Sequence, residues 1–154
     1  MKQNFLAPVL VGFLLLPTWI EVGAAPANRL IAPSDAARGG LDRAWFTQVR
    51  LDPGRAKVEH LRLFEATGRL PDTLFVQTDR AAVHAIDAET GRTLWVRLVG
   101  SPNHPSMAVG ASDEIVGVVN GTTLYLIDRA DGRIVWTRRV AGVPADGPVL
   151  TDHF

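Results

Sequence analysis

A nine-residue stretch that occurs twice constrains this chain more than any other feature. Residues 87–95 read DAETGRTLW, and residues 128–136 read DRADGRIVW, at an offset of 41 residues. The match continues without a gap over residues 72–99 and 113–140. The identical pairs include Asp87/Asp128, Gly91/Gly132, Arg92/Arg133, Trp95/Trp136 and Arg97/Arg138. An internal repeat of this period indicates a unit that stacks on copies of itself, such as a propeller blade or a solenoid turn.

Each copy contains three short apolar runs. They fall at residues 74–77, 82–86 and 93–99 in the first copy and at 115–119, 123–127 and 134–140 in the second. Runs of this length, rich in β-branched and aromatic residues and bounded by turn residues, predict β-strands. They are too short for helices with a buried stripe of their own.

The residues between the runs suit tight turns. The Asn-Gly pair at 120–121 is the strongest short signal for a hairpin, because both residues tolerate positive φ. Asp87 and Asp128 open the next turns, where an aspartate can accept hydrogen bonds from the backbone N–H groups that follow it. Gly91 and Gly132 then supply a residue in the left-handed conformation.

A fourth strand is expected before each trio. Residues 106–109 are the candidate in the second copy, and residues 148–150 would open a third copy. In the first copy the candidate lies at residues 57–65, which would also suit a short helix, and the repeat favours the strand. Four strands in about 41 residues are the size of a propeller blade. We therefore predict an all-β fold, a partial β-propeller of four-stranded antiparallel blades.

The pattern L-Y-L-I-D-x-x-x-G-x-x-x-W at residues 124–136 resembles the repeat of PQQ-like β-propellers. That group includes quinoprotein dehydrogenases and the BamB-like lipoprotein of the outer-membrane barrel-assembly machinery. The resemblance extends over roughly residues 58–154. It implies that Trp95 and Trp136 each pack between neighbouring blades, so the two positions are expected to be equivalent.

Residues 1–27 have the order of a secretory signal peptide. A basic start is followed by an apolar run, a proline and an A-x-A site. We expect cleavage after Ala27, with Ala25 as the alternative, and export to the periplasm or the extracellular space. An uncleaved anchor is the competing interpretation, but Pro8, Pro17 and Glu21 interrupt a span that needs about 20 apolar residues. No membrane span is expected once the signal is removed.

Residues 28–56 are interpreted as a lead-in to the blades at residues 57–154. Residues 28–42 suit a linker, because Pro33 and the pair Gly39-Gly40 disfavour a regular element. Residues 43–49 resemble the outer strand around Trp136, which suggests that Trp45 completes the last blade of a ring. The alternative is an isolated strand packed on the first blade.

Two blades and the start of a third are fewer than the four to eight blades of a propeller ring. We therefore expect that further blades are missing and that the sequence is the N-terminal part of a longer protein. The alternative is that copies of the chain associate to close a ring.

Composition narrows the classes of partner and of chemistry. The 16 basic and 16 acidic residues give no support for nucleic-acid binding, which needs a concentrated basic surface. The absence of cysteine excludes disulfides, thiolate metal sites and a lipid-modified N-terminal cysteine. This last point departs from the barrel-assembly lipoprotein. The four histidines show no metal-binding spacing.

Candidate binding residues fall in loops at one end of the predicted blades. Strands alternate in direction, so the middle hairpin of each blade and the connection to the next blade emerge together, and loops on a rigid scaffold commonly bind partners. The polar members of these loops are Asp79, Arg80, Asn103, His104, Asn120 and Asp146. The turns that begin at Asp87 and Asp128 should lie at the opposite end.

The function predicted from these features is an exported, non-catalytic β-propeller scaffold that binds a protein or a ligand at the cell envelope. No catalytic residue, metal ligand or cofactor is predicted. The alternative is part of a quinone-dependent alcohol or sugar dehydrogenase, for which the resemblance implies PQQ, calcium and a catalytic aspartate. No position can be matched to those ligands, and the vicinal cysteine pair of such enzymes is missing. A carbohydrate- or peptide-binding module of a larger secreted protein is a third possibility.

Overall fold

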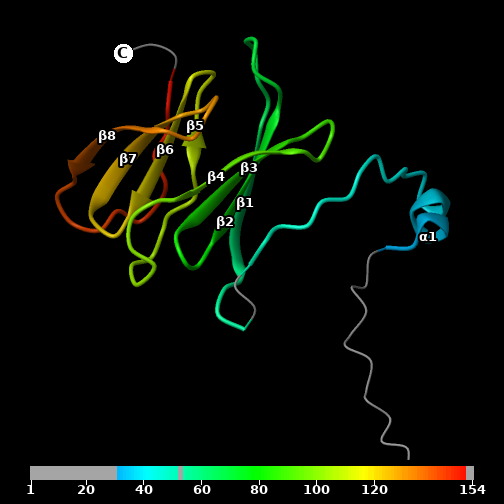
Figure 1. Ribbon diagram of the computed structural model, residues 1–154, viewed down its shortest axis with the longest axis horizontal. Coiled ribbons are helices and arrows are strands. Elements are labelled where there is room, and N and C mark those ends of the chain that lie inside the picture. Colours follow the sequence, from blue (N-terminus) through cyan, green and yellow to red (C-terminus); the bar gives the residue numbers. More distant parts are fainter. Residues whose placement is uncertain (1–30, 52–53, 152–154) are drawn as a thin grey trace, which may run out of the picture.

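A computed structural model describes residues 31–51 and 54–151 of the chain. In this part the protein is almost entirely β-structure, and its strands form two four-stranded antiparallel sheets (Figure 1). The strand orders are β1-β2-β3-β4 and β5-β6-β7-β8, so each sheet is a simple up-and-down meander. Each sheet corresponds to one copy of the repeat, and we call them blade 1 and blade 2. The predicted all-β fold with four-stranded antiparallel blades is confirmed.

The strands fall on the apolar runs of the sequence. Blade 1 consists of β1 (Val58–Phe64), β2 (Thr73–Thr78), β3 (Ala82–Asp87) and β4 (Thr93–Leu98). Blade 2 consists of β5 (Gly110–Ala111), β6 (Ile115–Asn120), β7 (Thr123–Asp128) and β8 (Ile134–Arg139). The segment at residues 57–65, which suited either a strand or a helix, is a strand. Its pairing with β2 extends from Val58 to Phe64.

The repeat is reproduced in the details of the backbone. The register between the third and fourth strands shifts between Ala85 and Ile86 in blade 1 and between Leu126 and Ile127 in blade 2. Gly91 and Gly132 have φ angles of 73° and 72°, as the turn prediction required. Two sequences that differ at most positions therefore adopt the same bulge and the same turn.

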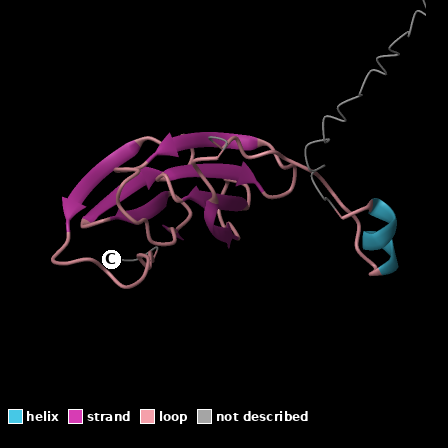
Figure 2. Cartoon of the chain, turned by 90° about the horizontal axis from the view of Figure 1, so that it is seen from below, coloured by secondary structure: helices cyan, strands magenta, loops and turns pink. Residues whose placement is uncertain are grey.

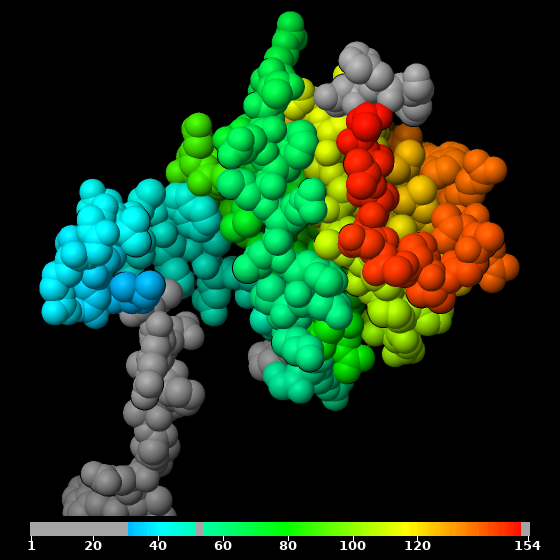
Figure 3. Space-filling model, turned by 180° about the vertical axis from the view of Figure 1, so that it is seen from behind, coloured from blue at the N-terminus to red at the C-terminus, as the bar shows by residue number. Residues whose placement is uncertain are grey.

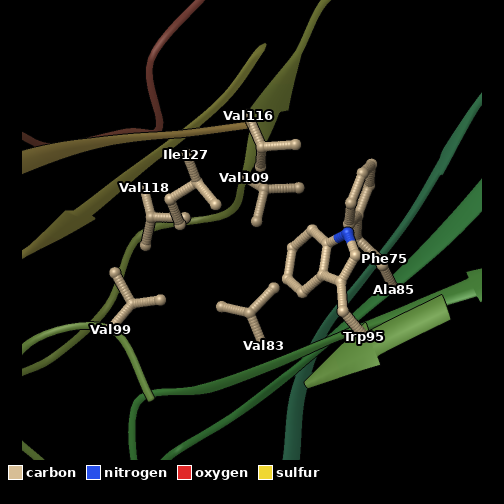
Figure 4. Packing of buried hydrophobic residues seen from close by; sticks show 9 residues of the cluster. All are labelled: Phe75, Val83, Ala85, Trp95, Val99, Val109, Val116, Val118 and Ile127. Atoms are coloured by element: carbon tan, nitrogen blue, oxygen red, sulfur yellow. The ribbon is translucent and has the colours of Figure 1, made fainter. Parts of the chain in front are cut away.

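One hydrophobic core lies between the two blades (Figure 4). Its members from blade 1 are Phe75, Val83, Ala85, Trp95 and Val99, and those from blade 2 are Val109, Val116, Val118 and Ile127. The rings of Phe75 and Trp95 are tilted by 48°, with centroids 6.1 Å apart, a favourable aromatic arrangement. Because the blades bury their apolar faces on each other, neither blade has a separate core.

The innermost strand of blade 2 differs from the prediction. Residues 106–109 were expected to form it, but the paired strand is Gly110–Ala111, preceded by a single bridge between Ser106 and Asn120. The buried side chain of Gln77 explains part of the difference. Its amide donates to the carbonyl of Met107 (3.0 Å) and accepts from the N–H of Val109 (2.9 Å). A side chain from blade 1 thus replaces the strand partner at these backbone groups.

The lead-in contains a helix that the sequence prediction missed. Residues 28–42 were expected to be a linker, but Pro33–Arg38 forms the short helix α1. Proline fits the first turn of a helix, where its missing N–H is not needed, and Gly39 ends the helix. Asp35 pairs with Arg38 one turn later. Figure 2 shows α1 apart from the strand layers, and none of its residues is buried.

Two further segments lie where strands of a blade were expected, but neither is paired as a strand. Residues 43–49 form no strand, although burial alternates from residue to residue between residues 44 and 50, as in a strand with one covered face. Residues 148–150 also form no strand. They lie against blade 2, where a Cβ on Gly110 would fall 1.9 Å from the carbonyl oxygen of Pro148. In Figure 3 the red C-terminal segment lies across the yellow part of blade 2. The predicted signal peptide, residues 1–27, lies outside the described residues.

Candidate binding face and the contacts between blades

The predicted binding loops gather at one end of the blades. Figure 1 shows the turn between β2 and β3 and the connection from β4 to β5 at the same end of the sheets. Asn103, His104 and Asp146 are exposed there, and so is Arg80. The turns that begin at Asp87 and Asp128 lie at the other end, as antiparallel pairing requires. We call the first end the candidate binding face.

Asn120 holds the loop that carries Asn103 and His104. Its side chain is 2% exposed. The amide nitrogen donates to the carbonyls of Ser101 (3.1 Å) and His104 (3.0 Å) and to the hydroxyl of Ser106 (3.0 Å), and the amide oxygen accepts from the N–H of Ser101 (2.8 Å). Asn120 was named as a candidate binding residue, but the structure buries it and uses its polar atoms within the chain. It therefore anchors the loop and leaves Asn103 and His104 accessible.

A second polar region adjoins Asp79 and Arg80. Asp79 exchanges hydrogen bonds with the backbone of Lys57, and Arg80 donates through Nε to the carbonyl of Arg55 (2.8 Å). Beside them lies a shallow, open hollow, which is lined by Gly54, Arg55, Ala56, Lys57 and Asp79. Its charged lining consists of two cationic side chains, Arg55 and Lys57, and one carboxylate, Asp79, so the hollow carries a net positive charge.

The opposite end carries a buried cation that the sequence analysis did not identify. Arg129 is 1% exposed, and its guanidinium donates to the carbonyls of Asp113 (2.8 Å) and Pro71 (3.0 Å) and to the hydroxyl of Thr73 (3.1 Å). It also lies 5.1 Å from the ring centroid of Phe64, within the range of a cation–π contact. Arg129 therefore joins the turn of blade 2 to strands of blade 1.

Ion pairing around Arg129 involves Asp113. The two groups are 3.7 Å apart, and Asp113 also accepts hydrogen bonds from the hydroxyl and the N–H of Thr67. These hydrogen bonds from Thr67 lower the pKa of Asp113, and burial lowers the pKa of Arg129. Arg129 aligns with Ala88 in the repeat, so the repeat gave no signal for it. A lone arginine within a turn does not predict burial.

The two blades are joined by a contact between Trp95 and the turn of blade 2. The indole Nε1 of Trp95 donates to the carbonyl of Arg129 (2.8 Å), and the ring covers Gly132 so closely that a Cβ there would lie 2.6 Å from it. Arg97, on the same strand, donates through Nε to the carbonyl of Gly132 (2.7 Å). Trp95 is 7% exposed. Its predicted position between blades is confirmed.

Trp45 makes the same contact with blade 1. Its Nε1 donates to the carbonyl of Ala88 (2.8 Å), and its ring lies 2.6 Å from the place of a Cβ on Gly91. Ala88 and Gly91 are the repeat equivalents of Arg129 and Gly132. The segment around Trp45 therefore stands where the outer strand of a preceding blade would stand, which favours the ring-completing interpretation over an isolated strand.

Trp136 departs from the expected equivalence with Trp95. It is 41% exposed, and every residue of β8 is exposed in the described structure. The reason is geometrical, since each tryptophan docks on the turn of the next blade and no described residue brings such a turn to Trp136. The expectation of equal burial at the two sites is therefore wrong for the described chain.

The two aspartates of the repeat shape their turns. Asp87 accepts from the N–H groups of Glu89 and Thr90, both at 3.0 Å, and Asp128 accepts from Ala130 at 2.9 Å. The hydrogen bond from the backbone of Thr90 is the largest cause that lowers the pKa of Asp87. Both carboxylates point into their own turns, so they do not converge on one substrate.

Among the described residues, neither the buried histidine His84 nor any group of acidic side chains offers a metal site. His84 is buried in β3, its Nε2 has no hydrogen-bond partner, and burial lowers its pKa. Nowhere in residues 31–51 and 54–151 do three His, Cys, Asp or Glu side chains form a group that could hold a metal ion. The one described helix is too short to cross a membrane, and no other span of that kind occurs in this part of the chain.

Four-stranded blades, an Asp-x-x-x-Gly turn and an outer-strand tryptophan seated on the next turn define a PQQ-like repeat protein with a partial β-propeller fold. The family model described as outer membrane protein assembly factor BamB matches residues 33–152. The chain belongs to this family.

Individual relatives overlap only in part. "Probable protein phosphatase 2C 34" of Oryza sativa, in both the indica and japonica subspecies, is 30% identical over 122 residues, which are 79% of this chain and 29% of the relative. The chain thus spans less than a third of these curated relatives. Among solved structures, BamB from Moraxella catarrhalis is 26% identical with a TM-score of 0.40, covering 44% of this chain and 21% of that one. A europium-containing methanol dehydrogenase is 24% identical with a TM-score of 0.41, covering 53% and 15%.

Proposed function

We propose that the protein is an exported, non-catalytic propeller scaffold whose candidate binding face recognises a protein or another ligand at the cell envelope. Membership of a family described as an outer-membrane assembly factor supports this class of function. Export rests on the signal-like order of residues 1–27.

The observation that carries the proposal is the way Asn120 fixes its loop. The buried amide of Asn120 donates to the carbonyls of Ser101 and His104 and to the hydroxyl of Ser106, and it accepts from the N–H of Ser101, so it holds this loop against the β6–β7 hairpin. The neighbouring side chains of Asn103 and His104 remain exposed. A fixed backbone that presents free polar side chains reduces the entropy lost on binding.

Other polar residues, at the interface between the two blades, hold the blades together. Gln77 and Arg129 are buried and hydrogen-bonded across the two blades. This use of polar groups supports a stable platform with its recognition chemistry in the loops.

Site-specific photo-crosslinking in cells tests the proposal. A photoreactive amino acid at Asn103 should give a discrete adduct of defined mass, and the same residue at Glu89, which is exposed at the opposite end, should not. Adducts of equal yield from both positions, or none from Asn103, would contradict a dedicated binding face.

The dehydrogenase alternative requires a separate measurement. PQQ and calcium are added to the purified chain, and reduction of a redox dye by alcohols or sugars is followed. Turnover above a control without quinone would replace the scaffold proposal. Mass spectrometry of the exported protein tests the location, with an N-terminus at Asn28 as the expected result.

A further inference from the structure

Asn120 and Gly121 form the only Asn-Gly pair in the sequence, and such a pair is prone to a spontaneous reaction. The backbone nitrogen of Gly121 attacks Cγ of the Asn120 side chain, and glycine has no Cβ to hinder the approach. A C–N bond forms, the bond from Cγ to Nδ2 breaks, and ammonia leaves with the proton of the attacking nitrogen. Water then opens the cyclic imide at either carbonyl, so the product is aspartate or isoaspartate.

One loop, residues 101–106, engages both reacting groups. The amide nitrogen of Asn120 donates to two carbonyls and one hydroxyl of this loop, over 3.0 to 3.1 Å. The N–H of Gly121 donates to the carbonyl of Pro105 (2.9 Å). Both reactants are therefore held by hydrogen bonds that the reaction has to break.

The same two residues are shielded from water. Asn120 is 2% exposed, and Gly121 is buried. The imidazole of His104 lies close to Gly121, where an added Cβ would be 3.1 Å from Nδ1. Gly100 also packs closely, since a Cβ there would lie 2.3 Å from the amide oxygen of Asn120. The reaction needs a base to take the proton from the attacking nitrogen and water to open the imide, so this packing withholds both.

We propose that Asn120 is a modification site controlled by the loop of residues 101–106. The closed loop blocks the reaction, and each opening of the loop exposes both reacting groups to base and water. The product does not rebuild the closed state, because a carboxylate has no N–H for the three oxygen atoms that the amide contacts. These acceptors lose their donor and face a negative charge, which is costly in a buried position.

The modification therefore releases the loop irreversibly. Isoaspartate also adds a methylene group to the backbone of the β6–β7 hairpin, which disturbs the strand register. The released loop is the one that presents Asn103 and His104, so the state of Asn120 sets the shape of the candidate binding face. This chemistry is intrinsic to the chain, and its measurement requires no binding partner.

Peptide mass spectrometry measures the reaction. The purified chain is incubated at one mildly alkaline pH, folded in buffer or unfolded in urea, and the converted fraction of Asn120 is followed with time. We expect conversion in urea and a rate at least about tenfold lower in the folded chain, because only the open fraction reacts. Equal rates in the two conditions, or no conversion in urea, would overturn the proposal.

Two serine substitutions test the control by the loop. Ser106→Ala removes one acceptor of the Asn120 amide, so the folded chain should react about fivefold faster, the effect of one lost hydrogen bond. Ser101→Ala is the matched control, because Ser101 contacts Asn120 through its backbone N–H and carbonyl. Its rate should stay within about twofold of the wild type. Both variants should react like the wild type in urea, and equal rates of the two folded variants would contradict control by the loop.

Asn120→Asp tests the consequence for the loop. Amide hydrogen exchange is followed at Gly121 and Met107, whose N–H groups donate across the contact between the loop region and the hairpin. Exchange at both should be at least about fivefold faster than in the wild type. Asn103→Asp makes the same change at an exposed position and should leave this exchange unaltered. Exchange within β2 and β3 should also stay unaltered, which distinguishes loop release from unfolding of the blade.

The wild-type chain, converted in urea and returned to buffer, provides a second sample that contains the natural products. Unaltered exchange at Gly121 and Met107 in both samples would show that the modified loop stays closed. Faster exchange throughout β2 and β3 would show that the modification acts on the whole blade. Either result would refute release of the loop alone.

Discussion

The indole nitrogen of Trp95 lies 2.8 Å from the carbonyl oxygen of Arg129, and the side chain of that same arginine is buried in the preceding blade. One residue therefore accepts a hydrogen bond from blade 1 through its backbone and donates others to blade 1 through its guanidinium. The junction between the blades depends on both sets of hydrogen bonds, the one that the Arg129 backbone accepts and those that its guanidinium donates.

Removal of Trp95 should cost far more stability than removal of Trp136. Trp95→Ala deletes a buried aromatic side chain and should lower the free energy of unfolding by about 3–5 kcal/mol. Trp136→Ala removes an exposed side chain and should cost less than about 1 kcal/mol. Urea denaturation, at a concentration where the chain is monomeric, measures both. Equal losses would show that Trp136 is covered in solution.

A methyl group at Gly132 should be poorly tolerated for two reasons. Gly132→Ala places a Cβ 2.6 Å from the ring of Trp95 and puts an alanine at a φ of 72°. Gly142→Ala provides the matched control, because Gly142 has a φ of 81° but no atom within 4 Å of the added Cβ. The backbone strain alone costs about 1–3 kcal/mol. The additional loss at Gly132, measured by thermal or urea unfolding, reports the contact with Trp95, and its absence would mean that the ring moves away freely.

Arg129 should be difficult to replace even by another cation. Arg129→Lys keeps the charge but cannot supply donors to Asp113, Pro71 and Thr73 from a planar fork. We expect a loss of about 2–4 kcal/mol in the free energy of unfolding, since buried acceptors lose their partners. Arg133→Lys is the control, because Arg133 is exposed and its two carboxylate contacts are 3.6 and 3.9 Å long. A loss at Arg129 as small as at Arg133 would contradict the role of the buried fork.

Acidification should destabilise the protein through His84. Burial lowers the pKa of His84 from its ordinary value of 6.5. Below pH 6.5 the histidine therefore binds a proton more readily in the unfolded chain than in the folded chain. The free energy of unfolding consequently decreases as the pH falls toward the lowered pKa. Urea unfolding at pH 7.5 and pH 5.5 measures this loss, in a range above the titration of carboxylates such as Asp87 and Asp113.

The histidine substitutions separate this effect from others. His84→Gln should reduce the difference between the two pH values, and His104→Gln, at an exposed loop position, should retain it. An unchanged pH dependence in His84→Gln would assign the effect to another group.

The sequence predicted the repeating parts of the structure well because those parts are set by local rules. Alternation and β-branched residues locate the strands, and a glycine at φ near 70° leaves few substitutes at positions 91 and 132. The predictions failed where the outcome depends on residues distant in the sequence. Gln77 redirects the inner strand of blade 2, and Arg129 occupies a site between blades that its repeat partner Ala88 does not fill.

The candidate site shows the same division between local and distant effects. The end of the blades that carries Asn103, His104 and Asp146 followed from strand direction alone. The burial of Asn120 did not, because its hydrogen-bond partners belong to a loop 14 to 19 residues earlier in the chain. Trp136 was expected to be buried because the resemblance placed both Trp95 and Trp136 between neighbouring blades, yet its burial depends on what lies beside it and not on its own strand.

The exposed outer strand β8 has a consequence for solubility. Its apolar residues Ile134 and Val135 lie on an edge that pairs with no further strand in residues 31–51 and 54–151, and such an edge can template aggregation. Three arginines, at positions 133, 138 and 139, flank them. Repulsion between the arginines of two copies opposes the edge-to-edge pairing of their strands. This protection is electrostatic, with a range of about 10 Å at 0.1 M salt and about 3 Å at 1 M. The protein should therefore stay dispersed in dilute buffer and form disordered aggregates as salt is raised, unless a partner strand has already sealed the edge.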